Sequence, residues 1–233
     1  MKTRILIFMS MLVGASVFAQ ETQNMELTAS KDNFARSNHR NKNSGAAPLL
    51  LLAQMPSVVS IVAFDLSTVT NEIQSAEFSF RIQESSPTPV SLTVAPMVHN
   101  VANSAWIEGT GNLGLQGRNA ELGEVTFQWR SFRDRAWEDG KGRAAKNLMD
   151  PDIWEPALAQ LKNVEWVAGQ WITIKIDNAS FLEDIRKHEL QTVTFGLWGT
   201  AGDEAYKVDS KESGQPPKLN LTVNKPEKPV SAE

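Results

Sequence analysis

Between Ile73 and Val94, apolar and polar side chains alternate in two short runs. In the first run Phe78 and Phe80 share one side of an extended chain, and the polar residues between them share the other. A turn with two prolines follows, and Val90 and Leu92 begin the second run. Period-two alternation on both sides of a turn is typical of half-buried antiparallel strands. We therefore predict a hairpin here, whose apolar face an opposing sheet must cover.

Similar alternation or short buried runs recur along the chain and predict about nine or ten strands. Besides the hairpin strands, they are expected at 49–53, 58–65, 124–129, 171–177, 193–197, 206–209 and 219–223. Short helices are expected to begin at Asp150 and to cover 180–188, because each start carries capping residues. The pattern predicts an all-β, antiparallel β-sandwich of jelly-roll type, with two short helices and a long irregular insertion over about 110–169.

The chain ends differ in character from this domain. Lys2 and Arg4 precede an apolar run that ends near Ala19, which is typical of a secretory signal peptide over residues 1–19. Residues 20–26 are expected to be flexible, 27–224 to form the sandwich, and 225–233 to form a polar tail. No later stretch has the length of a membrane span. We therefore expect a secreted, extracellular or periplasmic protein.

Composition excludes several classes of protein. Of the 233 residues, 41% are hydrophobic and 21% are charged, so the chain is neither disordered nor membrane-embedded in composition. Without the leader's two basic residues, 21 basic residues remain against 27 acidic ones, a formal charge of −6 that argues against nucleic acid. There is no cysteine, so disulfides cannot stabilise the fold.

Six short motifs stand in an order that is typical of one family. They are KDNFAR at 31–36, FDLS at 64–67, SAEF at 75–78, WIEGT at 106–110, DSKE at 209–212 and PPKL at 216–219. Together they resemble the DNRLRE-type domain, also classed as the family-96 carbohydrate-binding modules, over most of residues 27–224. The resemblance implies a β-sandwich on secreted bacterial proteins, some of which bind acidic polysaccharides such as alginate. The chain departs from the family at Lys211, where arginine is more common, and at Phe127, where tryptophan is common; the segment after Trp106 is also longer here.

The segment Trp129–Lys146 holds six basic and three acidic residues, a local charge of +3 in an acidic chain. Guanidinium groups match carboxylate and sulfate geometry, and aromatic faces take the apolar side of a sugar ring. The candidate ligand-binding residues in this segment and in an earlier loop are Arg130, Arg133, Arg135, Trp137, Arg143, Arg36 and Arg40. The alternative is a solvated loop whose arginines pair with its own acids.

Two of the seven tryptophans are out of phase with the inward residues of their strands. Trp171 and Trp198 are therefore expected on sheet faces opposite the sandwich core, as candidate sugar platforms. Alternatively, the long insertion folds over that face and buries them. Trp106, Trp154 and Trp166 are expected to be packing residues.

Catalytic signals are weak. The three histidines lie in unrelated contexts, and no zinc-protease, hydrolase or phosphate-loop motif is present. The sequence identifies no cofactor with certainty, although a structural calcium ion is left open, with Asp32, Asp65, Asp203 and Glu204 as candidate ligands. We expect a secreted, non-catalytic carbohydrate-binding module. Its expected partner is a polysaccharide, with an anionic polysaccharide favoured. Other secreted glycan-degrading proteins are possible further partners. The alternatives are a structural or adhesive extracellular protein without sugar binding and, third, a polysaccharide lyase or hydrolase.

Overall fold

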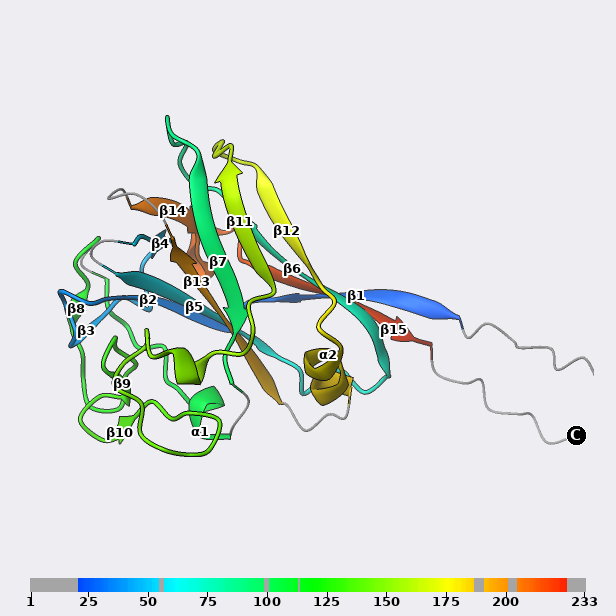
Figure 1. The fold of residues 1–233 in the computed structure, drawn as a ribbon, viewed down its shortest axis with the longest axis horizontal. Helices are drawn as coiled ribbons and strands as arrows, with labels where there is room; N and C mark the ends of the chain where they lie inside the picture. The colour runs from blue at the N-terminus through cyan, green and yellow to red at the C-terminus, as the bar shows by residue number, and fades with distance from the viewer. Residues whose placement is uncertain are drawn as a thin grey trace, which may run out of the picture.

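The computed structural model describes residues 21–54, 57–98, 101–112, 114–186, 191–200 and 205–225. All strands within these ranges pair antiparallel, which confirms the all-β, antiparallel class (Figure 1). The predicted signal peptide and residues 226–233 of the predicted tail lie outside the described residues. No helix within these ranges is long and apolar enough to cross a membrane.

The elements follow one another in this order: β1 (Thr22–Thr28), β2 (Lys31–Arg36), β3 (Lys42–Asn43), β4 (Leu49–Leu52), β5 (Val58–Asp65), β6 (Ile73–Arg81), β7 (Val90–Pro96), α1 (Val101–Ser104), β8 (Arg118–Asn119), β9 (Trp129–Ser131), β10 (Arg135–Ala136), η1 (Pro151–Ile153), β11 (Ala159–Val164), β12 (Trp171–Ile176), α2 (Ala179–Arg186), β13 (Thr192–Gly199), β14 (Tyr206–Asp209), η2 (Lys211–Ser213) and β15 (Lys218–Asn224).

Two sheets form the body of the fold. The outer sheet has the strand order β1-β15-β6-β12, and the central sheet has the order β11-β7-β13-β5-β2. Between them lies the main hydrophobic core, in which Phe78 of β6 stacks on Phe195 of β13 with ring centroids 4.8 Å apart. The two sheets therefore pack face to face as a sandwich. The finer jelly-roll assignment stays a prediction.

The predicted hairpin is wrong, although both of its strands exist. β6 belongs to the outer sheet and β7 to the central sheet, so the turn with Pro87 and Pro89 carries the chain across the core. Alternation records which face of a strand is buried, not which strand lies beside it. Phe78 and Leu92 are both fully buried, but they reach the same core from opposite sheets.

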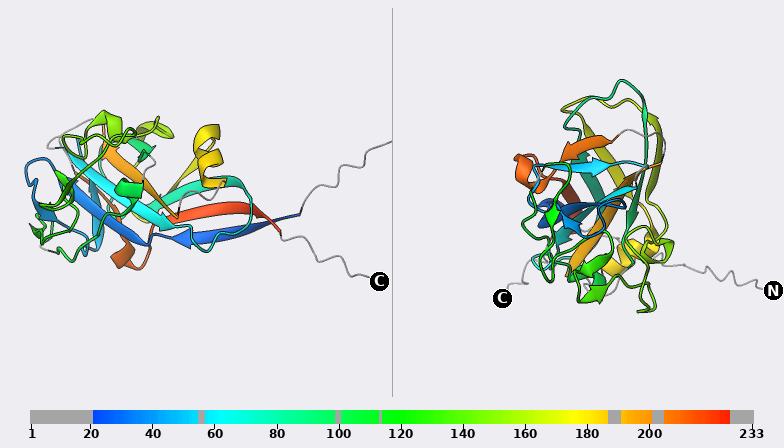
Figure 2. Two further views of the ribbon diagram at one scale, coloured as in Figure 1. Left: turned by 90° about the horizontal axis from the view of Figure 1, so that it is seen from below. Right: turned by 90° about the vertical axis from the view of Figure 1, so that its left-hand side faces the viewer.

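The first described strand also differs from expectation. Residues 20–26 are predicted to be flexible, yet β1 pairs with β15 from Thr22 to Thr28. This edge strand is bound mainly through its backbone, and only Met25 and Leu27 pack against the core. A mostly polar sequence is therefore sufficient to form this edge strand. Figure 2 shows β1 and β15 reaching together beyond the other strands.

One of the two predicted helices is confirmed. α2 is capped by Asn178, whose Oδ1 accepts hydrogen bonds from the backbone N–H groups of Ser180 and Phe181. The helix predicted at Asp150 is a single 3₁₀ turn, η1, because Pro156 cannot continue a helix. The second described α-helix is instead α1. The strand predicted at 124–129 does not form: Glu124 makes an isolated bridge with Ile107, Trp129 begins β9, and the backbone N–H of Thr126 between them donates to the carbonyl of Trp129 at 2.8 Å.

The long insertion covers the face of the central sheet that points away from the outer sheet. A second core joins Ala35 of β2 and alternate residues of β5, such as Val59 and Ile61, to buried residues of the insertion. The insertion contributes Val125, Phe127, Trp137, Leu148 and Ile153, and Trp106, which precedes the insertion, joins them. Figure 1 shows β9, β10 and α1 gathered beside the central sheet. The molecule thus has three layers, and only part of the central sheet's second face stays open.

Candidate functional site

The open part of that face carries two neighbouring indoles. Trp198 of β13 and Trp154, just after η1, have ring centroids 5.3 Å apart at an interplanar angle of 46°. Both side chains are half-buried. They line a shallow hollow of about 500 Å³ together with Thr93, Ala95, Met149, Pro151, Glu155, Pro156, Ala157 and Gln160. We call this the tryptophan hollow.

Local structure holds Trp154 in place from three sides. Its Nε1 donates to the carbonyl of Leu148 at 3.0 Å, and the backbone N–H of Glu155 donates to the carbonyl of Pro96 at 2.9 Å. Its ring lies over Gly196 of β13, where an added Cβ would come within 2.4 Å of two ring carbons. The ring position therefore depends on the missing side chain at Gly196.

A second hollow of about 680 Å³ adjoins the first and shares Met149 and Pro151 with it. Its charged lining residues are Arg143, Lys146, Asp139, Asp150 and Asp152, and we call it the ionic hollow. The side chain of Arg143 is 66% exposed and is bound to Asp139, with Nε 2.6 Å from Oδ2. The joined surface thus offers aromatic faces on one side and both signs of charge on the other.

The carboxylate of Asp139 organises the turn that carries Arg143. It accepts hydrogen bonds from the backbone N–H groups of Lys141 and Arg143, each at 2.8 Å. The backbone N–H of Arg143 is the main cause that lowers the pKa of Asp139 below its ordinary value. This carboxylate is therefore ionised at neutral pH and neutralises part of the guanidinium charge.

Two predicted ligand residues face inward. Trp137 has 0% exposure, belongs to the second core and donates from Nε1 to the carbonyl of Thr126 at 3.3 Å. Arg130 is only 8% exposed, and its Nε has no hydrogen-bond partner among the described residues. The expectation that these side chains contact a ligand is wrong, because both are buried, Trp137 against the central sheet.

The remaining predicted arginines of this segment are exposed but dispersed. The guanidinium of Arg133 lies over the ring of Phe132, 5.1 Å from its centroid. Arg135 lies 3.7 Å from a carboxylate oxygen of Asp134. Pairing with neighbouring acids, which the sequence left as the alternative, therefore holds for Arg135 and for Arg143.

The two arginines of the earlier loop bind backbone carbonyls. Arg36 Nη1 donates to Leu115 at 2.7 Å, and Arg40 Nε donates to Ser37 at 3.2 Å. The carbonyl of Arg40 accepts a hydrogen bond from the backbone N–H of Gln128 at 3.4 Å. The fold therefore brings this loop beside the start of the basic segment.

Trp171 lies on the exposed face of the outer sheet, as its phase predicts. It is half-buried at the start of β12, and the Nζ of Lys218 lies 5.2 Å from its ring centroid. Lys218 also pairs with Glu26 at 3.0 Å. Trp171 and Trp198 belong to different sheets, so the fold does not combine them in one site.

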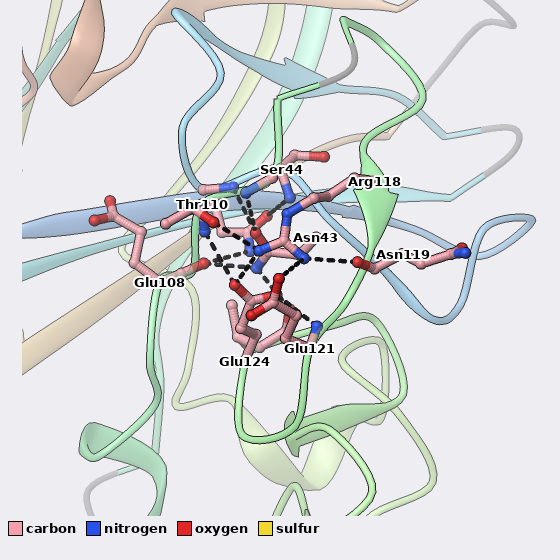
Figure 3. Close-up of polar contacts among 12 residues, drawn as sticks. Asn43, Ser44, Glu108, Thr110, Arg118, Asn119, Glu121 and Glu124 are labelled. Atoms are coloured by element: carbon pink, nitrogen blue, oxygen red, sulfur yellow. Dashed lines mark hydrogen bonds and ion pairs between the residues drawn. The ribbon is translucent and has the colours of Figure 1, made fainter.

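The loop after Trp106 is held by a network around Asn43 (Figure 3). Asn43 Nδ2 donates to the carbonyls of Glu108 and Val125 at 2.6 and 3.0 Å, and its Oδ1 accepts from the backbone N–H of Gly111 at 2.9 Å. Figure 3 shows the Glu108 side chain pointing away from Asn43. The network therefore fixes the backbone from which Glu108 projects.

Glu108, two residues after Trp106, contacts protein groups rather than open surface. Its Oε1 accepts from the backbone N–H of Asp32 at 2.6 Å, and its Oε2 lies 3.1 Å from the Nζ of Lys211. Burial raises the pKa values of Glu108 and Asp32 above their ordinary range. These contacts assign Glu108 a role in joining distant segments.

Other predicted positions lie elsewhere or outside the described residues. Asp65 is exposed, and its Oδ1 accepts from the backbone N–H of Ser67 at 2.8 Å. The remaining calcium candidates, Asp203 and Glu204, are outside the described residues, as are the histidines at 99 and 188. Trp106 and Trp166 are buried, as expected of packing residues.

Trp154 is the residue that sequence reasoning missed. The expectation of a packing residue is confirmed, because Trp154 packs against the second core, but its half-buried ring also lines the tryptophan hollow. A signal for it exists in β13, where Gly196 interrupts a strand of larger residues. Glycine within a strand often marks a close approach by another group. The sequence does not identify which group that is.

No family model and no curated protein matches this chain. The resemblance to DNRLRE-type domains therefore stays a prediction.

Proposed function

We propose that this chain is an exported, non-catalytic carbohydrate-binding β-sandwich that binds a glycan in the tryptophan hollow. The observation that carries the proposal is the half-buried pair Trp154 and Trp198, placed beside the charged side chains of the ionic hollow. Indole faces take the apolar side of a sugar ring, and charged groups bond to its hydroxyls. Export rests on the signal-like sequence of residues 1–19.

The lining of the joined hollows bears on the class of glycan. Arg143 and Lys146 provide two positive charges, while the acids of the two hollows are Asp139, Asp150, Asp152 and Glu155. An acidic polysaccharide would meet more negative than positive charge here, and like charges repel. A neutral, hydroxyl-rich glycan is therefore favoured over the anionic one that the basic segment suggested.

The absence of catalysis is part of the proposal. Glu108, an acid two residues after Trp106, is bound to the backbone of Asp32 and to Lys211. Its carboxylate thus already serves the packing of three segments. A turnover assay on any glycan that binds tests this part separately, and release of reducing ends or unsaturated products would contradict it.

Affinity electrophoresis against neutral and acidic polysaccharides tests binding. We expect the wild type to be retarded by at least one neutral glycan, and Trp198→Ala to lose most of that retardation. Trp171→Ala is the matched control, because Trp171 is also half-buried but lies on the other sheet. Equal retardation of the wild type and Trp198→Ala by that glycan would contradict the proposal that the glycan binds in the tryptophan hollow. No retardation by any glycan would favour the structural or adhesive alternative.

A further inference from the structure

Three carboxylates from distant parts of the chain converge at one end of β2. They belong to Asp32 of β2, Glu108 of the loop after Trp106, and Glu212 of η2. Each contributes an oxygen, and these oxygens all lie within 4.8 Å of one another. A donor set made only of carboxylate oxygens suits a hard divalent cation such as Ca²⁺.

The buried member of this cluster has an unsatisfied oxygen. Asp32 is 1% exposed, and its Oδ2 accepts a hydrogen bond from the backbone N–H of Lys211 at 2.6 Å. Its Oδ1 is also buried and has no hydrogen-bond partner among the described residues. A buried carboxylate oxygen without a donor is costly, and a bound cation removes that cost.

The basic groups nearby do not neutralise all three carboxylates. The Nζ of Lys211 lies 3.1 Å from Glu108 and 2.6 Å from Glu212, so one ammonium serves two acids. Lys31 directs its Nζ to the backbone carbonyls of Ser104 and Trp106, at 2.8 and 2.7 Å. Neither ammonium is paired with the carboxylate of Asp32.

The backbone around the cluster is fixed before any cation binds. Ser210 Oγ donates to the carbonyl of Ala47 at 2.7 Å and accepts from the backbone N–H of Glu212 at 3.2 Å, which starts η2. The carbonyl of Glu108 is held by Asn43 at 2.6 Å. The three acids therefore project from anchored positions, and little ordering is needed on binding.

We propose that Asp32, Glu108 and Glu212 form a divalent cation site of the calcium type, in which the ammonium of Lys211 competes with the metal ion. Without the ion, Lys211 bridges Glu108 and Glu212. With the ion bound, the ammonium leaves these two carboxylates to the metal, and the free oxygen of Asp32 gains a partner. The site is independent of the tryptophan hollow.

Calorimetric titration of CaCl₂ into the full mature chain tests the site, with MgCl₂ in parallel. We expect wild-type dissociation constants between about 10⁻⁴ and 10⁻³ M, the range of extracellular calcium modules. Lys211→Met removes the competing charge and should tighten calcium binding by roughly tenfold or more. Glu212→Gln removes an acid at the accessible side of the cluster and should weaken binding by about tenfold.

Asp32→Asn should fold and lose calcium binding. The amide oxygen can still accept from Lys211, and the amide nitrogen can donate to the neighbouring carboxylates. Asp65→Asn, an exposed acid outside the cluster, should bind calcium as the wild type does. The proposal is overturned if neither the wild type nor Lys211→Met binds calcium, or if Asp32→Asn binds it as tightly as the wild type. Circular dichroism establishes that each variant is folded.

Discussion

The indole of Trp154 fills the space that a side chain at residue 196 would occupy. A Cβ added to Gly196 would lie 2.4 Å from both Cη2 and Cζ3 of that ring, far closer than van der Waals contact. Trp154 is 42 residues earlier in the chain, and its segment is held against the end of β7. The shape of the tryptophan hollow therefore depends on one missing side chain.

Gly196→Ala should displace this ring. Overpacking of this kind costs about 1–3 kcal/mol, so the free energy of unfolding should fall by that amount in urea denaturation. Retardation by the glycan should fall as well, because Trp154 moves away from Trp198. Gly140→Ala is the control, since a Cβ there meets only Val98 at 4.0 Å. If Gly196→Ala matches this control in stability, the close contact is not present in solution.

Trp137 should matter for stability and not for recognition. Trp137→Ala removes a fully buried ring from the second core and should lower the free energy of unfolding by about 3–5 kcal/mol. Arg133→Ala, an exposed neighbour in the same segment, should change it by less than about 0.5 kcal/mol. Urea denaturation, monitored by tryptophan fluorescence, measures the free energy of unfolding of both variants. If Trp137→Ala is as stable as the wild type but loses glycan binding, Trp137 contacts the ligand and this account of it is wrong.

The stability that the Asp139 carboxylate contributes should decrease at acidic pH. Its pKa is lowered in the folded protein, so its contribution to stability is fully present above the ordinary carboxyl pKa of about 4. That contribution is lost as the pH falls through the lower folded pKa. The stability difference between wild type and Asp139→Asn should therefore be largest near pH 6 and shrink toward pH 3. A difference that stays constant over this range would show that the carboxylate charge is not involved.

Alternation in the sequence predicts strands well where one face is buried. β5 has the predicted bounds, β12 ends one residue before the predicted strand does, and Trp198 and Trp171 lie on the faces that their phase indicates. The same pattern cannot predict partners, because β6 and β7 bury equivalent faces in different sheets. It also overlooks edge strands such as β1, whose backbone supplies most of the binding.

The candidate sites depend on contacts over long stretches of chain. The sequence indicates Trp198 and Arg143 as ligand-binding residues for separate reasons, and the fold brings them to adjoining hollows. The sequence does not indicate Trp154 as a member of this site, since its contacts with Leu148 and Gly196 exist only in the fold. The acids Asp32, Glu108 and Glu212 span most of the domain in sequence. Their convergence therefore cannot be predicted from spacing.

The central claim is that the tryptophan hollow binds sugar. Isothermal titration of an oligosaccharide from a retained glycan into wild type, Trp198→Ala and Trp171→Ala tests it most directly. Loss of an aromatic anchor at a binding site typically costs 2 kcal/mol or more, so Trp198→Ala should bind at least about thirtyfold more weakly. Trp171→Ala should bind as the wild type does. Unchanged affinity in Trp198→Ala, or a loss confined to Trp171→Ala, would contradict the claim.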